Sequence, residues 1–162
     1  GPVVTPAYDH NEQETRMAKI SDRDGLWHRM GDMGYLDEQG LLWFCGRKAH
    51  RVLTEDGPMY TICCEAIFNE HPKVFRSALV GVGDPGKQQP VLTVELYAQK
   101  PKDEQRICEE LRELARANPL TRKIETFMFF APFPVDIRHN AKIFREKLTV
   151  WVQQRIACRQ GL

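Results

Sequence analysis

Two runs of apolar, largely β-branched residues lie on either side of a glycine-rich segment near the middle of the chain. Residues 77–83 read SALVGVG and residues 90–98 read PVLTVELYA. Runs of this length and composition, bounded by Gly and Pro, predict strands. The pair therefore predicts two strands of a sheet joined by a turn, and the other elements of the fold must be arranged around them.

The segment between these strands, GVGDPGKQQP, also fits two phosphate-binding patterns. Gly81, Gly86 and Lys87 have the spacing G-x-x-x-x-G-K, and Gly83 completes a G-x-G-x-x-G pattern. A phosphate loop works because N–H groups of the turn and of the helix that follows face the phosphates. Here Lys87 is followed by Gln-Gln-Pro and then by a strand, so both the helix and the usual Ser or Thr are missing. We predict a structural turn.

The remaining patterns place hairpins first and a β-α-β-β-α-β-α order after them. Residues 1–14 are polar and irregular. The expected elements are short strands at 17–20 and 26–30, hairpins at 34–46 and 50–61, helices at 63–72 and 102–117, a strand that leads into a loop with two prolines over 124–135, and a last helix at 144–157. This order predicts an α+β fold, in which a small mixed β-sheet is covered by helices.

Composition limits the classes of protein that the chain can represent. Its 162 residues allow one domain, or one domain and a piece of another. Apolar residues at 42% and charged residues at 28% permit a globular core. A net charge of +1 argues against a nucleic-acid binder, and no apolar run approaches the roughly 20 residues of a membrane span. The chain starts without Met, so we expect a fragment or a processed chain.

The cysteines point to a reducing compartment. Their odd number and irregular spacing, without a C-x-x-C pair, predict free thiols and a cytoplasmic protein. The sequence also shows no cluster of metal ligands, so no metal site is predicted within the chain. The five cysteines are Cys45, Cys63, Cys64, Cys108 and Cys158.

One candidate binding site combines an acidic and a basic residue at the ends of the 34–46 hairpin. Asp32 follows Gly31, and Arg47 follows Gly46. A carboxylate at a strand end can accept hydrogen bonds from the two hydroxyls of a ribose, and a guanidinium offers a fork of donors to oxygen-rich ligands. Residue types alone equally permit a simple Asp32–Arg47 ion pair on the surface.

A second candidate is the polar, basic stretch PVDIRHNAKI at 134–143, between an apolar strand and an apolar helix. It contains His139 and Lys142. A positioned ammonium group can stabilise charge that develops on a phosphoryl or carboxylate oxygen. The alternative is a solvated loop whose basic residues have no chemical role, and a single His is weak evidence for catalysis.

Four segments, in this order, resemble the adenylate-forming enzymes, the family of acyl-CoA synthetases, peptide-synthetase adenylation domains and luciferases. The segments are GPVVTPAYDHNEQET (1–15), WHRMGDMGYLDEQGLLWFCGRK (27–48), CEAIFNEHPKVFRSALVGVGD (64–84) and PVDIRHNAKIFREKL (134–148). The resemblance covers nearly the whole chain. It implies the fold of the mobile C-terminal domain of the family, preceded by hairpins from the large N-terminal domain.

The resemblance also implies roles for individual residues. Asp32 would bind the ribose hydroxyls of ATP or AMP, and Arg47 would make a second contact on the ribose side. Lys142 would steady the substrate carboxylate and the α-phosphate while an acyl-adenylate forms, with Mg²⁺ accompanying the ATP. Because a carboxylate that attacks a phosphate brings two anions together, a cation between them lowers the barrier.

The same resemblance divides the chain. Residues 1–47 would be the end of the large N-terminal domain, Lys48 and Ala49 would form the hinge, and residues 50–162 would be the mobile C-terminal lid. Ala49 stands where the family usually has Asp or Lys. The upstream phosphate loop and the acyl pocket are not in this chain, so we expect it to be inactive by itself.

Two further departures from the family's motifs point to one group within the family. VLTEDGPMYT replaces the Ile-Lys-x-x-Gly segment near the thioester-forming site, and RHNA replaces the common Ser-Gly before the lysine. With CEAIFNEHP and IRHNAKIFREKL, these segments resemble the β-lactone synthetases of bacterial long-chain olefin biosynthesis. In that group a 2-alkyl-3-hydroxy fatty acid is adenylated, and its own 3-hydroxyl displaces AMP. The implied partners are ATP, the hydroxy acid, the missing N-terminal domain and other enzymes of the olefin pathway.

Two other functions stay open. One is a long-chain acyl-CoA synthetase, which would pass the acyl group to coenzyme A. The other is a non-catalytic docking module that keeps the fold without the activity.

Overall fold

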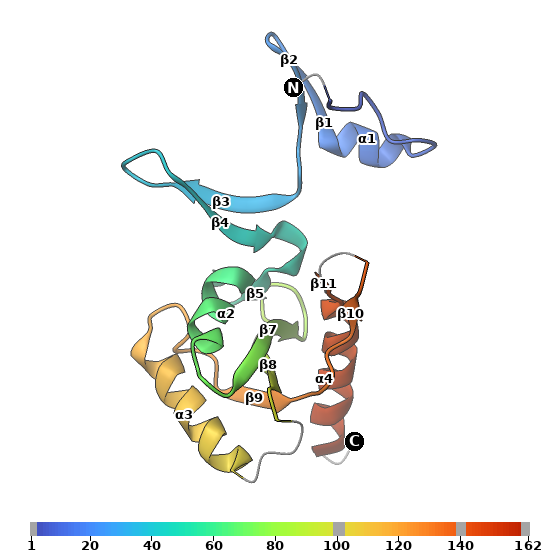
Figure 1. The fold of residues 1–162 in the computed structure, drawn as a ribbon. Coiled ribbons are helices and arrows are strands. Elements are labelled where there is room, and N and C mark those ends of the chain that lie inside the picture. The colour runs from blue at the N-terminus through green and yellow to red at the C-terminus, as the bar shows by residue number, and fades with distance from the viewer. Residues whose placement is uncertain (1–2, 99–102, 139–141, 160–162) are drawn as a thin grey trace. The chain divides into compact units, whose positions relative to one another are not determined.

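The computed structural model describes residues 3–98, 103–138 and 142–159, and statements about structure below refer to these ranges. The chain divides into two compact units, Gly1–Ala49 and His50–Leu162. Each unit has its own strands and helices, shown in Figure 1. His139, Asn140 and Ala141 of the predicted lysine loop lie outside the described residues.

The first unit consists of a short helix and two hairpins. Its elements are α1 (Glu12–Ala18), β1 (Lys19–Asp22), β2 (Gly25–His28), β3 (Asp32–Leu36) and β4 (Leu42–Arg47), and the 3-10 helix η1 (Lys48–His50) follows. Strand β1 pairs antiparallel with β2, and β3 pairs antiparallel with β4. The predicted 34–46 hairpin is confirmed.

Helix α1 corrects the sequence prediction, which expected irregular chain up to residue 14 and a strand at 17–20. The side chain of Asn11 caps the helix by accepting a hydrogen bond from the Glu14 N–H at 3.1 Å. Acidic Glu12 and Glu14 stand in the first turn and Arg16 stands in the last, as the helix dipole favours. This capping signal was present in the sequence and outweighs the apolar pattern that suggested a strand.

The turn between β3 and β4 is held by one carboxylate. Oδ1 of Asp37 accepts hydrogen bonds from the N–H groups of Gln39 at 3.0 Å and Leu41 at 2.8 Å. Gly40 adopts φ +78°, a conformation that side chains other than glycine rarely take. The turn chemistry therefore fixes the register that brings the two ends of the hairpin together.

The second unit is built on one mixed sheet. Its elements are β5 (Val52–Thr54), β6 (Gly57–Met59), α2 (Thr61–Asn69), β7 (Val74–Val82), β8 (Gln89–Leu96), α3 (Glu104–Ala117), β9 (Thr126–Phe129), β10 (Val135–Asp136), β11 (Lys142–Ile143) and α4 (Arg145–Arg159). The sheet has the order β7-β8-β9, with β7 and β8 antiparallel and β8 and β9 parallel. The predicted small mixed sheet covered by helices is confirmed.

Backbone N–H groups of the turn between β7 and β8 donate hydrogen bonds to other groups of the protein. The N–H groups of Gly86 and Gln88 both donate to the carbonyl of Leu53, and the Lys87 N–H donates to Asp84. The side chain of Gln88 in turn accepts a hydrogen bond from the Leu53 N–H at 2.8 Å. The glycine-rich segment is therefore a structural turn that also holds the β5–β6 hairpin, as the sequence predicted.

Alternation along the three sheet strands produces two buried clusters, one on each face of the sheet. Helices α2 and α3 cover the first face and α4 covers the second (Figure 1). The first cluster includes Phe68, Leu79, Leu92, Val94, Ile107, Leu111 and Phe127. The second includes Ala78, Val80, Val91, Met128, Phe133, Leu148 and Val152. Neighbouring residues on one strand thus pack into opposite clusters, which explains why the central stretches of β7 and β8 do not alternate between apolar and charged residues.

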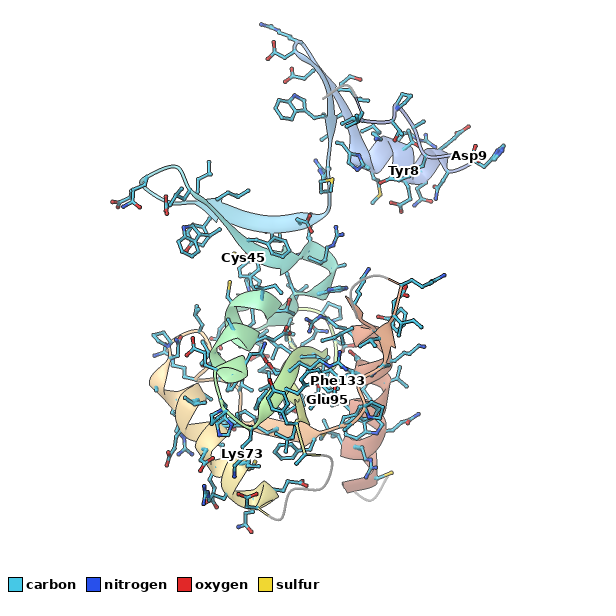
Figure 2. All side chains as sticks on the ribbon, in the orientation of Figure 1. Tyr8, Asp9, Cys45, Lys73, Glu95 and Phe133 are labelled. Carbon is cyan, nitrogen blue, oxygen red and sulfur yellow. The ribbon has the colours of Figure 1, made fainter. Side chains whose placement is uncertain are left out.

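The segment after β9 begins as predicted, because the strand leads into a loop that contains Pro132 and Pro134. Strand β9 ends at Phe129, and the chain then bends through a cis peptide bond between Ala131 and Pro132. The N–H of Phe133 donates to Glu95, and the two residues lie side by side in Figure 2. The stretch predicted as a loop contains the short β10–β11 ladder.

Within the described ranges, no helix combines the length and the apolar character that a bilayer crossing requires.

Candidate active-site residues

Asp32 and Arg47 are brought together by the β3–β4 hairpin, in which they are direct cross-strand partners. One guanidinium nitrogen of Arg47 lies 3.1 Å from Oδ1 of Asp32 and donates to the carbonyl of Met30 at 2.7 Å. The side chain of Arg47 is 46% exposed and that of Asp32 is 33% exposed. The ion pair that the residue types permitted is therefore formed, at the surface of the first unit.

This pairing leaves part of the Asp32 carboxylate for another group. Arg47 contacts Oδ1, and about a third of the Asp32 side chain (33%) remains exposed. Arg47 holds the carboxylate in one orientation through a charge-assisted contact. The arrangement can accept a hydroxyl group of a ligand without breaking the ion pair, so both interpretations of the two residues are compatible with one geometry.

The two residues predicted as a hinge, Lys48 and Ala49, lie in η1, where the chain passes from the first compact unit to the second. The Lys48 N–H donates to the carbonyl of Gly31 at 2.8 Å, so it continues the hydrogen bonding of the β3–β4 end. Their role as a hinge remains a prediction.

Lys142 belongs to the second unit and lies on β11, opposite Asp136 of β10. Its side chain is exposed and forms no ion pair within the described ranges. Its neighbour Ile143 packs against the second buried cluster, and the next N–H, of Phe144, donates to the carbonyl of Pro134 at 2.8 Å. The backbone is thus fixed while the ammonium group projects outward.

The carboxylate opposite Lys142 is engaged by a different cation. Arg138 donates from Nε to Oδ1 of Asp136 at 3.1 Å and from a terminal nitrogen to Oδ2 at 3.2 Å. Its backbone N–H also donates to Oδ1 at 3.0 Å. Because this fork compensates the charge of Asp136, the lysine across the ladder remains available to an external anion.

The sequence did not predict a buried ion pair between Glu65 and Arg145, which lies three positions after Lys142. Arg145 donates to Oε1 of Glu65 at 2.5 Å and to Oε2 at 2.8 Å, and Oε1 also accepts the Leu79 N–H at 2.7 Å. Burial, the largest effect, raises the pKa of Glu65, while the Arg145 guanidinium and the Leu79 N–H act to lower it. The available signal was a single Glu inside the apolar run CCEAIF, but its partner lies 80 positions away.

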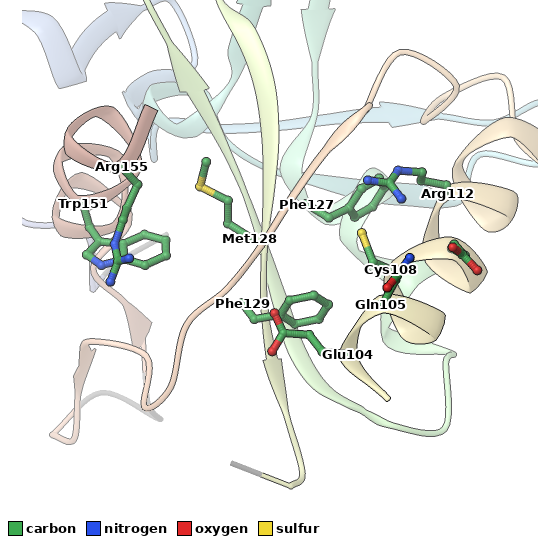
Figure 3. Close-up of a pocket in the computed structure, with 10 residues that line it drawn as sticks. Glu104, Gln105, Cys108, Arg112, Phe127, Met128, Phe129, Trp151 and Arg155 are labelled. Carbon is green, nitrogen blue, oxygen red and sulfur yellow. The ribbon is translucent and has the colours of Figure 1, made fainter. Parts of the chain in front are cut away.

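One hollow of the second unit lies away from these residues. It has a volume of about 670 Å³ and follows β9 between α3 and α4, at the edge of the sheet (Figure 3). None of the predicted site residues lines it. The side chains around it include Glu104, Cys108, Arg112, Phe127, Met128, Trp151 and Arg155.

No group of three or more His, Cys, Asp or Glu side chains suited to a metal ion occurs among the described residues.

Comparison with known proteins gives this geometry a context. No protein-family model matches the chain. In solved structures, the chain matches an amide bond synthetase from Marinactinospora thermotolerans with a TM-score of 0.75 and 27% identity, over 93% of this chain and 29% of the other. It matches the O-succinylbenzoate coenzyme A synthetase of Bacillus subtilis, solved with AMP, with a TM-score of 0.71 and 23% identity, over 91% of this chain and 28% of the other.

By fold and sequence, the chain belongs to the adenylate-forming enzymes and corresponds to a portion from their C-terminal part. More narrowly, it is 53% identical to an olefin β-lactone synthetase of Xanthomonas campestris pv. campestris and 48% identical to one of Stenotrophomonas maltophilia. Each match covers 96% of this chain and 29% of the relative. A 2-succinylbenzoate–CoA ligase of Bacillus licheniformis is 32% identical over 91% of this chain and 29% of its own length.

The chain thus spans less than a third of the length of these relatives. The resemblance to β-lactone synthetases, which the sequence motifs indicated, is confirmed. The roles of Asp32, Arg47 and Lys142 are not tested by the comparisons and remain predictions.

Proposed function

We propose that the chain acts as the C-terminal part of an ATP-dependent ligase that converts a 2-alkyl-3-hydroxy fatty acid into a β-lactone for olefin biosynthesis. The observation that supports this most strongly is the 53% identity to an olefin β-lactone synthetase across almost the whole chain. The exposed ammonium of Lys142 on a fixed backbone supplies the chemical group that adenylate formation requires.

In the first step a carboxylate oxygen of the acid attacks the α-phosphorus of ATP. The bond from that phosphorus to the oxygen bridging to the β-phosphate breaks, and pyrophosphate leaves with both electrons of the bond. Lys142 donates hydrogen bonds to the carboxylate and to an α-phosphate oxygen, so it offsets the repulsion between the two anions.

In the second step the 3-hydroxyl oxygen attacks the acyl carbon of the adenylate. The bond between that carbon and the phosphate oxygen breaks, AMP leaves, and the hydroxyl proton passes to solvent. The product is a four-membered lactone, and coenzyme A takes no part. Because the nucleophile and the acyl carbon belong to one molecule, the ring closes without a second substrate.

Asp32 and Arg47 are proposed to hold the ribose of the nucleotide. The exposed carboxylate of Asp32 accepts a ribose hydroxyl, while Arg47 keeps the carboxylate oriented and offers its remaining donors. Mg²⁺ is proposed to arrive with ATP, bound by its phosphates.

The division of labour along the chain is also a proposal. Residues 1–47 are the end of the N-terminal domain, residues 48–49 are the hinge, and residues 50–162 are the mobile lid, which needs the N-terminal domain for activity. No disulfide joins the five cysteines, all of which lie in the described ranges, and this supports a cytoplasmic location. Other enzymes of the olefin pathway are the expected partners.

The test replaces Lys142 with Ala in the full-length ligase and measures pyrophosphate release from ATP and a 3-hydroxy acid. We expect release to fall about 100-fold or more, as when a group that stabilises developing charge is removed. Lys87→Ala is the matched control, because Lys87 is an exposed lysine of the same unit in the structural turn. Unchanged release by Lys142→Ala would remove the role given to this lysine.

A second candidate is a ligase that transfers the acyl group to coenzyme A, favoured by the 32% identity to a 2-succinylbenzoate–CoA ligase. The intact enzyme is incubated with ATP and a 3-hydroxy acid, with and without coenzyme A, and the products are separated by mass. A lactone formed without coenzyme A supports the first proposal, and a thioester that forms only with coenzyme A supports the second.

A further inference from the structure

The buried ion pair between Glu65 and Arg145 ties three elements of the second unit together. Glu65 belongs to α2, Arg145 is the first residue of α4, and Leu79 lies in the middle of β7. Only 6% of the Glu65 side chain and 12% of the Arg145 side chain are exposed. Arg145 also donates to the Leu79 carbonyl at 3.3 Å, so one guanidinium bridges a helix and the central part of the sheet.

The place of Arg145 is unfavourable for the helix itself. A cation in the first turn of a helix meets the positive end of the helix dipole. Burying an arginine also costs free energy unless its donors are satisfied. Two contacts to Glu65 and one to Leu79 offset part of these costs, which indicates that this arginine serves the connection between elements more than helix formation.

Lys142 stands just before this anchor. The two positions are three steps apart along the chain, and an extended chain advances at most about 3.6 Å per residue, so their Cα atoms lie within about 11 Å. Between them, Ile143 packs on the second buried cluster and the Phe144 N–H donates to Pro134. The short segment from Lys142 to Arg145 is therefore fixed at its far end by a bidentate contact, which resists rotation better than a single bond.

We propose that Glu65 and Arg145 are positioning residues for Lys142, holding the start of α4 in the place that directs the lysine at the reacting carboxylate and α-phosphate. This inference rests on the proposed role of Lys142. The ion pair touches no substrate and acts through the backbone between Arg145 and Lys142. A loss of position should therefore slow the chemical step more than it weakens ATP binding.

The test uses the full-length ligase and the variants Arg145→Lys and Glu65→Gln. Arg145→Lys keeps the charge but loses the bidentate fork, and Glu65→Gln keeps an acceptor for the Leu79 N–H but loses the charge. Glu110→Gln is the matched control. It weakens the contact of His71 with Glu110 at 2.9 Å, an ion pair of the same unit that joins the end of α2 to α3.

Each variant is assayed for pyrophosphate–ATP exchange at a temperature at which circular dichroism shows it folded. We expect Arg145→Lys to lower kcat about 100-fold, as for a misplacement of about 1 Å. The KM for ATP should change less than about threefold, since uniform binding is kept. Glu65→Gln should act in the same direction, and Glu110→Gln should leave both constants unchanged.

A double variant separates positioning from a general loss of structure. In a Lys142→Ala background, Arg145→Lys should cause no further loss of rate, because the group that it positions is already absent. An Arg145→Lys enzyme as active as wild type, or one that loses the same factor with and without Lys142, overturns the inference while the role of Lys142 stands. If Lys142→Ala alone leaves the rate unchanged, the proposed role of Lys142 fails, and the positioning role fails with it.

Discussion

The two compact units differ in how far their β-structure buries its apolar side chains. In the second unit, each face of the three-stranded sheet packs against helices and its apolar side chains are buried. In the first unit, the β3–β4 hairpin exposes most of its large apolar side chains. These are Tyr35 at 56%, Leu36 at 68%, Leu41 at 57%, Leu42 at 75%, Trp43 at 52% and Phe44 at 53% exposed.

This difference shows which unit carries its own core. A two-stranded hairpin is marginally stable by itself in water, and a contiguous exposed apolar surface marks an interaction site. The curated relatives are more than three times as long as the matched region. The open hairpin face therefore supports the proposal that residues 1–47 belong to a larger N-terminal domain, whereas the second unit is closed on both sides of its sheet.

The largest expected effect compares one buried and one exposed side chain. Phe68 is fully buried and packs edge-on against Phe127 at 5.7 Å between ring centroids, while Leu42 is 75% exposed. In the 162-residue chain, Phe68→Ala should lower the free energy of unfolding of the second unit by about 3–5 kcal/mol. Leu42→Ala should change stability by no more than about 0.5 kcal/mol.

Both changes in stability are measured by urea unfolding with amide hydrogen exchange as the probe, because exchange reports on each unit separately. A cost for Leu42→Ala as large as that for Phe68→Ala would break the comparison, because it would show that the hairpin side chain is buried in solution.

A smaller effect concerns two glycines, one in each unit. A Cβ on Gly34 would lie 2.7 Å from the backbone carbonyl oxygen of Trp43, while a Cβ on Gly81 would meet the side chain of Gln88 at the same distance. Gly34→Ala should open the β3–β4 ladder at a cost of about 1–3 kcal/mol, because backbone cannot move aside easily.

Gly81→Ala should cost less, since the Gln88 side chain can rotate, although it then loses its bond to the Leu53 N–H. Amide exchange of the β3–β4 and β7–β8 strand pairs measures the two costs. Gln88→Ala serves as the control, because it removes the side chain that a Cβ on Gly81 would meet. Equal protection of the β3–β4 amides in Gly34→Ala and wild type would contradict the expected steric cost.

The smallest effect is a pH dependence within the open hairpin. The Trp43 indole N–H donates to Oδ2 of Asp37 at 2.7 Å, and this bond is the largest cause that lowers the pKa of Asp37 below its ordinary 3.8. Since the folded pKa is depressed, the carboxylate stabilises the turn above pH 3.8, and this support is lost as the pH falls through the lower folded value.

An NMR titration of the Asp37 carboxyl carbon checks this. We expect Trp43→Phe, which removes the indole donor, to move the midpoint upward toward 3.8. A midpoint that stays unchanged in Trp43→Phe would assign the shift to the two backbone donors at Gln39 and Leu41 instead.

The sequence predicted the parts of this molecule that depend on local pattern. The apolar runs that became β7 and β8 predicted strands, and the glycine-rich segment between them predicted a turn. The turn residues of the β3–β4 hairpin indicated its pairing, but a register shift between Met33 and Gly34 was also needed to put Asp32 opposite Arg47. The motifs were also enough to indicate the family, because they follow one another in the family's order over nearly the whole chain.

Local pattern failed where several weak signals competed. Around residues 12–18, capping by Asn11 outweighed an apolar pattern that suggested a strand. After β9, the short β10–β11 ladder formed in a polar stretch that predicted a loop, since pairing of two residues leaves no periodic trace in the sequence.

Only the tertiary structure decided which residues act together over long distances along the chain. Glu65 and Arg145 are 80 positions apart and meet because α2 and the start of α4 both reach the middle of β7. A charge in an apolar run shows that a partner is needed, but not which residue provides it, because burial selects the partner through the fold. The sequence by itself determined the strands, the turns and the candidate lysine, and the packing of helices on the sheet determined what holds that lysine in place.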